Sequence, residues 1–398
     1  MADFARDNGI MRDDALPLIL QVTEALAGGV ARHLDLIWRA LPARGFAIAF
    51  AVSVDRNAGA AALAARWRAE GARVEVVPMC RAIRPMSDWR AGRKLRQIID
   101  AIRPTLVHTH ASKGGYLGRA AARHLHIPAV HTGHVFAFEW PRSAWRRFFY
   151  RLLERRASQW CDRIICLSAT QMEAAVAAGL GPPDKMAVVA NGVDSDEFKP
   201  PSEAERAAAR RRWGIGAEEL AVGTAVRLEA QKGIGHFLRA AAIIREALPN
   251  ARFFIAGEGS QESECRRRVA ALRMEKCISF CGNVVDMPVF YHALDCFVLT
   301  SLWEGLPYAI LEAQASGLPV VASCTVGAEM LIIDHESGIL TPLADEKALA
   351  AAVIQVLRDP QLAQYLGAWA RARICEHFTL ERWADNLAAV YRSVLGMR

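Results

Sequence analysis

Long apolar runs are absent from this sequence of 398 residues. The longest candidates, such as residues 253–257, have the length of a strand, far below the roughly 20 residues that a membrane-spanning helix needs. The first ten residues are polar and lack a signal-peptide pattern. We therefore expect a protein that neither spans a membrane nor is exported, but stays in the cytoplasm.

Closely paired cysteines are also missing. The nine cysteines are an odd number, and no two of them form a Cys-x-x-Cys pair. Cys277 and Cys281 would lie on one face of a strand rather than in a chelating loop. Cysteines of this kind are usually small buried side chains, so we expect no disulfide framework and no cysteine metal site.

Several cofactor and nucleic-acid motifs are absent. No Gly-x-Gly-x-x-Gly follows the first predicted strand of either half, which counts against a nicotinamide site. No Asp-x-Asp directly follows a predicted strand, so we expect cations of the protein, and no metal, to stabilise a phosphate. The formal charge of +7 fits nucleic acid, anionic lipid or a phosphorylated substrate. Because helix-turn-helix, zinc-knuckle and RNA-binding aromatic motifs are missing, we expect no nucleic-acid partner.

Short apolar runs alternate with helical patterns from end to end, which predicts parallel sheets covered on both faces. Predicted strands of the first half lie at residues 16–22, 47–52, 73–78, 106–108, 129–131, 163–167 and 187–190. Those of the second half lie at residues 221–226, 252–256, 278–281, 296–299 and 319–322.

The predicted fold class is therefore α/β, with one doubly wound, Rossmann-like layout used twice. Pro200 and Pro201 mark the hinge between the halves. We predict a first domain over residues 1–195 and a second over residues 196–378. Two such halves leave a cleft between the carboxyl ends of their sheets, where ligands bind in folds of this class.

Two acids in the second half, Glu304 and Glu312, are separated by seven residues, with a Gly-Leu-Pro turn after the first. Pro307 can open a helix at its first position, which leaves Glu304 in the loop and Glu312 one and a half turns into the helix. The amides of residues 308–310 would then be free to bind a phosphate. A ligand with hydroxyls at both ends and phosphate in the middle is a nucleotide sugar.

With these acids the chain resembles the retaining glycosyltransferases of family 4, which have the GT-B fold. The resemblance covers nearly the whole chain and is strongest over residues 297–331. Weaker signals in the family's order are Gly28-Gly29, Thr132-Gly133-His134, Asn191-Gly192-Val193-Asp194, Arg227 to Lys232-Gly233, and Gly257-Glu258-Gly259. The resemblance also implies that the C-terminal helix, residues 379–398, crosses back to the first domain.

The resemblance places most of the nucleotide-sugar donor on the second domain. Arg227 and Lys232 look like the family's diphosphate-binding pair. Glu312 would accept hydrogen bonds from the ribose, and Glu304 would act as a catalytic residue that binds the donor sugar near the reacting carbon. The other donor-binding residues that the motifs indicate are Gly28, Gly29, Gly257, Gly259, Val284, Gly305, Leu306, Tyr308 and Ala309.

His134 occupies the family's Thr-x-His position, so the resemblance makes it a second catalytic residue that touches the donor sugar. Val135 stands where the family usually has glycine, a departure that concerns the acceptor side. His110 is a further candidate on that side, although a histidine by itself is as often structural. The family implies retention of anomeric configuration, with the leaving phosphate taking the acceptor's proton.

Residues 140–161 predict an amphipathic helix. Trp145 and Phe148 recur at helical spacing, and Arg147 and Arg151 line a neighbouring face. Such a helix suits an anionic membrane surface. We expect Arg147 and Arg151 on the acceptor side, and a lipid-linked saccharide as acceptor at the inner face of the cytoplasmic membrane. A core-facing aromatic stripe with a solvated arginine face is the other interpretation and stays open.

The sequence thus predicts a metal-independent glycosyltransferase of the hexosyltransferase class, without a cofactor, that uses a nucleotide sugar. UDP is expected from its frequency in the family. One alternative is a nucleotide-sugar 2-epimerase of the same fold, which would consume donor without any acceptor. Another is a non-enzymatic protein that binds through its basic surface and would be indifferent to changes at Glu304 and Glu312.

Overall fold

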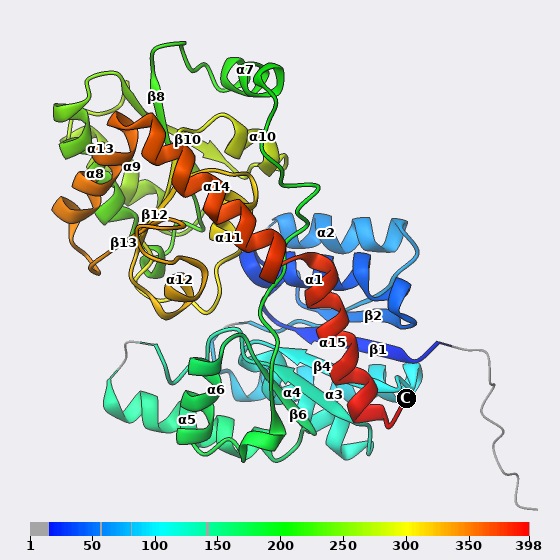
Figure 1. Ribbon diagram of the computed structural model, residues 1–398. Helices are drawn as coiled ribbons and strands as arrows, with labels where there is room; N and C mark the ends of the chain where they lie inside the picture. Colours follow the sequence, from blue (N-terminus) through cyan, green and yellow to red (C-terminus); the bar gives the residue numbers. More distant parts are fainter. Residues whose placement is uncertain (1–15, 56–57, 81, 141–142, 398) are drawn as a thin grey trace, which may run out of the picture.

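A computed structural model of the chain describes residues 16–55, 58–80, 82–140 and 143–397, and it shows two lobes (Figure 1). The first lobe is built on a seven-stranded sheet of order β3-β2-β1-β4-β5-β6-β7, and the second on a six-stranded sheet of order β10-β9-β8-β11-β12-β13. Neighbouring strands run parallel in both sheets. The predicted α/β class with two doubly wound sheets is confirmed.

The first lobe alternates strands with helices. Its elements are β1 (Leu18–Thr23), α1 (Gly28–Ala40), β2 (Ala47–Val52), α2 (Ala58–Ala69), β3 (Arg73–Val76), α3 (Pro85–Ile102), β4 (Leu106–His110), α4 (Lys113–His124), β5 (Ala129–Thr132), α5 (Ala144–Ser158), β6 (Arg163–Cys166), α6 (Ala169–Ala177) and β7 (Met186–Val188). The strands are buried along nearly their whole length, as in β2 and β4, because helices cover both faces of the sheet.

The second lobe repeats the layout. Its elements are α7 (Glu203–Arg212), β8 (Leu220–Ala225), α8 (Ile234–Ala247), β9 (Ala251–Ala256), α9 (Glu262–Ala271), β10 (Ile278–Gly282), α10 (Met287–His292), β11 (Cys296–Leu299), α11 (Tyr308–Ala315), β12 (Val320–Ser323), α12 (Val326–Leu331), β13 (Ile339–Thr341), α13 (Glu346–Arg358) and α14 (Pro360–His377). Short 3₁₀ turns occupy Pro42–Arg44, Pro183–Lys185 and Ala230–Lys232.

The seven strands predicted for the first half are all present, and their ends differ by up to a few residues. The strand predicted at residues 187–190 is Met186–Val188, for example. Apolar residues continue past the last ladder hydrogen bond, and the sequence pattern reports burial rather than pairing. The second lobe has six strands where five were predicted, because the short edge strand β13 (Ile339–Thr341) was missed. The predicted domain boundary after residue 195 falls in the segment between β7 and α7 and stays a prediction.

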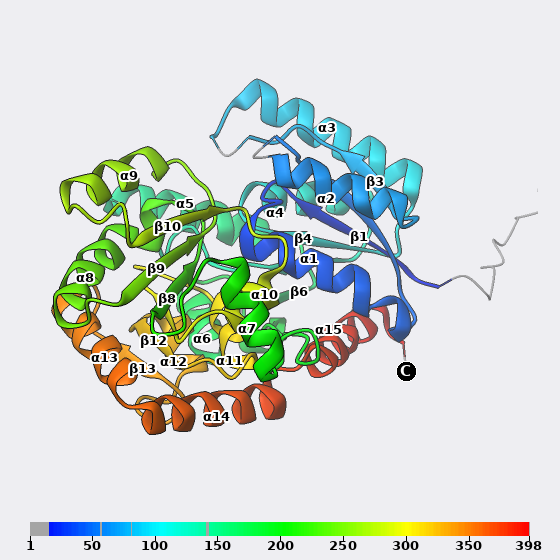
Figure 2. The same cartoon turned by 90° about the horizontal axis from the view of Figure 1, so that it is seen from above.

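The last helix, α15 (Leu380–Leu395), returns from the second lobe to the first. Figures 1 and 2 show α14 and α15 running along one side of the molecule from lobe to lobe. The apolar face of α15 buries Trp383 and Tyr391, and the Tyr391 ring meets Phe46 edge to face at 5.4 Å. Burying such aromatic rings fixes the helix on the first lobe.

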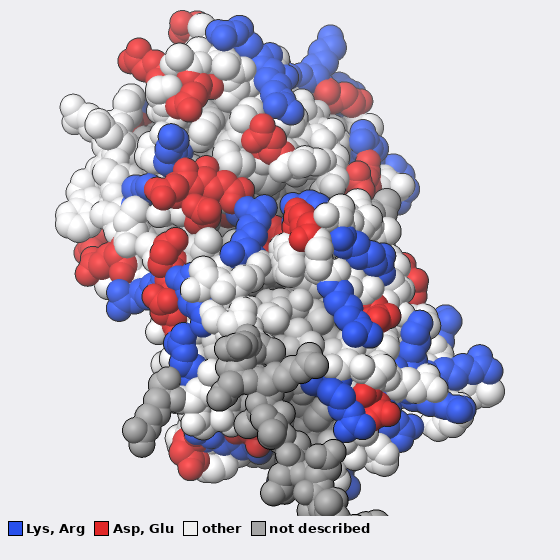
Figure 3. Space-filling model, turned by 90° about the vertical axis from the view of Figure 1, so that its right-hand side faces the viewer, with Lys and Arg blue, Asp and Glu red and all other residues white. Residues whose placement is uncertain are grey.

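The charged surface is mixed on the face drawn in Figure 3, where basic and acidic side chains alternate without one large basic patch. Within the described residues, no helix combines the length and apolar character needed to cross a membrane.

Candidate active site

The loops that follow β8 and β9 lie side by side at the carboxyl edge of the second sheet. Gly257 has a φ of +118°, and a Cβ atom there would lie 2.0 Å from the carbonyl oxygen of Val226. A Cβ atom at Gly259 would lie 2.5 Å from the carbonyl oxygen of Leu228. Since no side chain fits at either position, both glycines are required to bring their loop against the backbone around Arg227.

Lys232 and Glu304 form an ion pair at the same edge. Nζ of Lys232 lies 2.5 Å from Oε1 of Glu304, and the Ser301 hydroxyl donates to the same oxygen at 2.6 Å. The side chains of Lys232 and Glu304 are only 15% and 8% exposed. Because both bonds end on Oε1, the other carboxylate oxygen can accept hydroxyls of a ligand, and Nζ can donate further hydrogen bonds.

The two lobes touch beside this pair. A Cβ atom at Gly28, the first residue of α1, would lie 3.1 Å from Nε of Arg227, and one at Gly29 would lie 3.5 Å from the ring of Tyr308. The predicted glycine pair of the first domain therefore lies against predicted donor-binding residues of the second. The missing side chains allow the α1 N-terminus to come this close.

Helix α11 begins at Tyr308, one residue later than predicted, with Pro307 in an extended conformation at its N-cap. The prediction of three free amides is wrong for Ile310, whose amide donates to the Pro307 carbonyl at 3.2 Å. A 3₁₀-type bond of this kind tightens the first turn. It leaves the amides of Tyr308 and Ala309 as the donors that the helix start can offer to an anion.

Two other predicted donor residues lie in these loops with defined surroundings. The carbonyl of Leu306 accepts a hydrogen bond from the Asn191 side chain at 2.9 Å, which ties the α11 loop to the segment between the lobes. Val284, after β10, is partly buried and packs against the hydrophobic core. The carbonyl oxygen of Gly282, at the end of β10, accepts a hydrogen bond from the Gly257 amide at 2.6 Å. This loop therefore also lies at the carboxyl edge of the second sheet.

Glu312 is buried in α11 and has partners from both lobes. Its carboxylate accepts a hydrogen bond from the Tyr291 hydroxyl at 3.0 Å and lies 3.3 Å from Nε of Arg32, on α1. Burial raises the pKa of Glu312, against the opposing effects of Arg32 and Tyr291. A carboxylate held in this way keeps lone pairs that can accept ribose hydroxyls.

His134 lies directly at the contact between the lobes. Its φ of +48° is unusual for a residue with a side chain, and strain of this kind is typical of functional sites. Its carbonyl oxygen would lie 2.0 Å from a Cβ atom at Gly305, so only glycine fits there. Burial lowers the pKa of His134 to about 4, which keeps its ring neutral at pH 7.

His110, the predicted acceptor-side residue, adjoins His134. Nδ1 of His110 lies 3.3 Å from Nε2 of His134, and Nε2 of His110 lies 2.8 Å from Oε1 of Gln21. Burial, and then the neighbouring histidines, lower the pKa of His110 well below its ordinary value. The pair is therefore neutral and can exchange hydrogen bonds but carries no charge to the site.

Sequence reasoning missed Arg32 and His33 on α1. Nδ1 of His33 lies 3.0 Å from the hydroxyl of Tyr308, and Arg32 pairs with Glu312. Helical spacing was the available signal, because His33 lies four residues after Gly29 and so shares its face of the helix. Tyr391 of α15 reaches the neighbouring His108, and its position in the sequence did not indicate this contact.

The two predicted acceptor-side arginines are not among these contacts. Arg147 and Arg151 are exposed on α5, where Arg151 lies over the ring of Phe148 at 5.9 Å. Within the described part of the chain, neither makes an ion pair with the residues of the cleft. Their predicted role stays a prediction.

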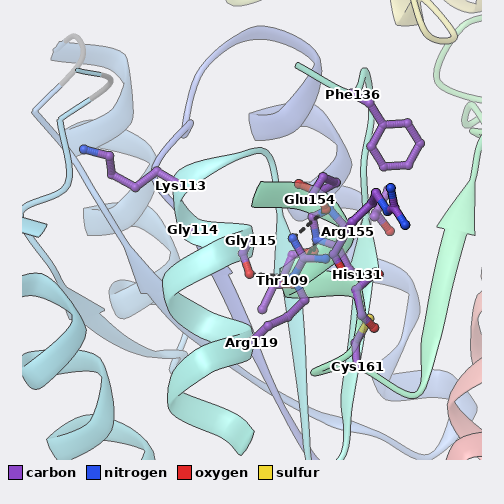
Figure 4. Close-up of polar contacts among 12 residues, drawn as sticks. Thr109, Lys113, Gly114, Gly115, Arg119, His131, Phe136, Glu154, Arg155 and Cys161 are labelled. Atoms are coloured by element: carbon purple, nitrogen blue, oxygen red, sulfur yellow. Dashed lines mark hydrogen bonds and ion pairs between the residues drawn. The ribbon is translucent and has the colours of Figure 1, made fainter. Parts of the chain in front are cut away.

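The inner face of α5 is fixed by one buried ion pair. Arg119 of α4 is fully buried and donates to Glu154 of α5 at 2.6 Å, and His131 of β5 lies 3.5 Å from the same carboxylate oxygen (Figure 4). His131 also contacts the side chain of Thr109 at 3.0 Å. With Glu154 held inward, the aromatic residues at the start of α5 face outward.

Comparison with known proteins agrees with this architecture. Residues 27–197 match the family model described as Glycosyltransferase Family 4, and residues 205–373 match Glycosyl transferases group 1. The chain is 31% identical over 320 residues to the UDP-Gal:alpha-D-GlcNAc-diphosphoundecaprenol alpha-1,3-galactosyltransferase of Escherichia coli, a match that covers 79% of this chain and 82% of that enzyme.

Solved structures share the fold. HepE of Anabaena, crystallised with UDP and glucose, matches with a TM-score of 0.80 at 20% identity, over 95% of this chain and all of that one. WaaG, a glycosyltransferase involved in lipopolysaccharide biosynthesis, matches with a TM-score of 0.73 at 16% identity, over 94% of this chain and 99% of that one. The protein is accordingly a glycosyltransferase of GT-B fold and belongs to family 4.

Proposed function

We propose that the protein transfers a sugar from a UDP-sugar to a lipid-linked saccharide, with retention of anomeric configuration and without a metal ion. The observation that carries the proposal is the Lys232–Glu304 pair, beside Arg227 and Tyr308, at the point where the two lobes touch. That arrangement offers cations to a diphosphate and carboxylates to the hydroxyls on either side of it.

The diphosphate leaves with negative charge, and fixed cations can stabilise it in place of a metal. Arg227 provides a planar fork and Lys232 a compact charge. The start of α11 adds two amides and the positive end of its dipole. UDP is supported by the donor in the name of the similar E. coli enzyme and by the UDP bound to HepE.

The donor sugar would lie between Glu304 and His134. The unpaired oxygen of Glu304 would accept sugar hydroxyls, and the neutral His134 would contact the sugar from the first lobe. No charged base is needed if the leaving phosphate oxygen takes the acceptor's proton on the same face, which is the hypothesis that family membership favours.

The transfer itself is tested with purified protein, UDP-galactose and a polyprenyl diphosphate GlcNAc acceptor in EDTA. We expect a product whose new linkage has the α configuration of the donor, observed by NMR. A product of inverted configuration would contradict retention. A requirement for Mg²⁺ would contradict metal independence. Consumption of donor without acceptor would favour the 2-epimerase instead.

The lipid-linked acceptor is supported by the outer face of α5. Its large apolar side chains are exposed: Trp145 to 66%, Phe148 to 60% and Leu152 to 53%. These values contradict the alternative of a core-facing stripe. Arginines flank the apolar residues, as in helices that lie on anionic membranes.

A second exposed apolar group lies at the start of α3. Met86 is 73% exposed and Trp89 61%. Because α3 packs on α4, which packs on α5, the three helices cover the same face of the sheet. Helices that join successive parallel strands run in the same direction, so the starts of α3 and α5 lie at the same edge. Together they offer two insertion points for one membrane.

Flotation with vesicles of anionic lipid tests this surface. The double substitution Trp145→Ser and Phe148→Ser should lower vesicle binding about 10-fold or more, since each aromatic contributes of the order of 1.5–3 kcal/mol on leaving water. Trp369→Ser is the matched control, because Trp369 is also exposed but lies on α14 of the second lobe. Equal binding by both variants would remove the membrane part of the proposal.

A further inference from the structure

Three histidines surround one point at the contact between the lobes: His33 of α1, His110 at the end of β4 and His134 after β5. One ring nitrogen of each lies within 4.8 Å of one ring nitrogen of each of the others. Their ring centroids are 4.8 to 5.4 Å apart. His33 and His110 are buried and His134 is partly exposed.

The outer hydrogen bonds of His110 fix which nitrogen faces inward. The amide nitrogen of Gln21 donates to the Tyr391 hydroxyl at 3.3 Å, so the Gln21 oxygen, 2.8 Å from His110 Nε2, accepts from that ring. The neutral ring then has its proton on Nε2 and a lone pair on Nδ1. Without an ion this lone pair accepts a hydrogen bond from Nε2 of His134 at 3.3 Å. An ion would replace that shared proton, with the His134 proton moving to Nδ1 of its ring.

His33 is oriented in a comparable way. Its Nδ1 lies 3.0 Å from the Tyr308 hydroxyl, while its Nε2 is buried and makes no hydrogen bond among the described residues. A buried polar atom without a partner is costly. If Nδ1 donates to Tyr308, Nε2 presents a lone pair. Histidines that bind metals typically have their second nitrogen held by such a partner.

We propose that His33, His110 and His134 form a binding site for a divalent transition-metal ion, with Zn²⁺ as the ion that three imidazoles suit best. Zinc–nitrogen bonds of about 2.0–2.1 Å place tetrahedral ligand nitrogens roughly 3.4 Å apart. The His110–His134 pair already has this spacing, at 3.3 Å. The His33 nitrogen, at most 4.8 Å from the other two, would have to move closer by about 1.5 Å or less. The fourth coordination position is left for water.

The ion is an inhibitor in this proposal and has no part in the transfer. Coordination would hold His134 away from the donor sugar and add positive charge where the lobes must accommodate that sugar. The inhibitory consequence depends on the proposed function, whereas zinc binding does not. The two are therefore tested separately.

Binding is tested by titrating Zn²⁺ into the full chain by calorimetry, without nucleotide sugar, and by absorption spectra with Co²⁺. We expect one ion per chain and the visible d–d bands of a four-coordinate nitrogen site, with no thiolate charge-transfer band from the cysteines. H33Q and H110Q should each weaken binding about 10-fold or more. H124Q, which removes an exposed histidine of α4, should leave it unchanged.

Circular dichroism identifies a variant that fails to fold. If H33Q or H110Q does so, zinc binding by the other of the two variants tests the site. Absence of binding by the unmodified chain, a thiolate band, or equal binding by folded H33Q or H110Q overturns the site. Zinc should also inhibit turnover by the unmodified chain, and EDTA should restore it. Zinc binding without inhibition would overturn the inhibitory role and leave both the site and the transfer intact.

Discussion

Lys232 and Glu304 neutralise each other at 2.5 Å in a largely buried position. A buried pair of this kind is weak evidence for stability, since removing both charges from water is costly. Under the proposed function the pair is a prepared site, in which Lys232 would turn to a diphosphate and Glu304 to hydroxyls. Glu304, which was singled out by its spacing from Glu312, and Lys232, which the family resemblance indicated, thus share one edge of the second sheet.

The Lys232→Ala substitution should lower kcat/KM about 10²-fold or more, because loss of one electrostatic donor to the leaving group has effects of this size. Steady-state transfer rates measure it. Lys347→Ala, at an exposed lysine of α13, is the control and should behave like the unmodified enzyme. Similar rates for both variants would contradict a role for Lys232 at the phosphate.

Glu312 predicts a pH dependence of donor binding. Burial raises its pKa above the ordinary value of 4.5, so the carboxylate gains a proton at a higher pH than a solvated glutamate does. Protonation removes acceptors for the ribose hydroxyls, and affinity for the UDP-sugar should therefore fall as the pH is lowered toward that pKa. Calorimetry should show this decline in the unmodified protein.

The matched variant is Glu312→Gln, which cannot titrate. It should bind the UDP-sugar more weakly at neutral pH but lose little further affinity on acidification. A nucleotide sugar is the appropriate ligand, because its diphosphate diester does not titrate in this range. Parallel pH profiles for both proteins would show that another group is responsible.

The local structure could be predicted where a short motif fixes it, as in the loop from Glu304 that leads into the start of α11 at Tyr308. Prediction failed where partners come from distant segments. Arg32, which pairs with Glu312, lies on the other lobe, and no local pattern connects the two residues. The Ile310 amide was misjudged because a 3₁₀-type bond in the first turn depends on backbone geometry that residue types do not reveal.

At the scale of elements, α15 ties the chain's end to the histidines of the first sheet. The Tyr391 hydroxyl lies 2.6 Å from Nδ1 of His108 and accepts from Gln21 at 3.3 Å. Gln21 in turn holds His110, next to His134. Helix α15 therefore supports the first-lobe side of the site as well as the core.

Tyr391→Phe should lower the free energy of unfolding by about 1–3 kcal/mol, because it leaves buried polar partners without a hydrogen bond while keeping the ring. Urea denaturation measures the change. Tyr365→Phe, at a 46% exposed tyrosine of α14, should be close to neutral. Equal stability of the two variants would show that the Tyr391 hydroxyl contributes little.

At the scale of the whole molecule, close backbone approach at glycines joins side-chain contacts such as Arg32–Glu312 in holding the two lobes together. A Cβ atom at Gly305 would lie 2.0 Å from the His134 carbonyl oxygen, so alanine there must push the lobes apart. We expect Gly305→Ala to reduce kcat/KM about 10²-fold, since a displacement of about 1 Å can have this cost.

Gly216→Ala is the control for this change, because its Cβ atom would meet only the Glu219 side chain at an ordinary 3.5 Å. It should retain the transfer rate. Full activity of Gly305→Ala would mean that the lobes need not approach as closely as they do here.

The two-lobed fold could be predicted from the sequence because alternating apolar runs and helical patterns persist along the whole chain. A cleft between the carboxyl ends of the two sheets follows from the fold class. How closely the lobes approach across it could not be predicted, since that depends on glycines whose missing side chains matter only in three dimensions. The contacts at Gly28, Gly29 and Gly305 give the physical cause of this close approach.

The most direct test of the central claim is a calorimetric titration of the UDP-sugar in EDTA. The account predicts binding that added Mg²⁺ does not strengthen, and that Arg227→Ala and Glu304→Gln each weaken about 10-fold or more. Binding that requires Mg²⁺, or that neither substitution changes, would contradict the claim that the cations and carboxylates between the lobes hold the donor.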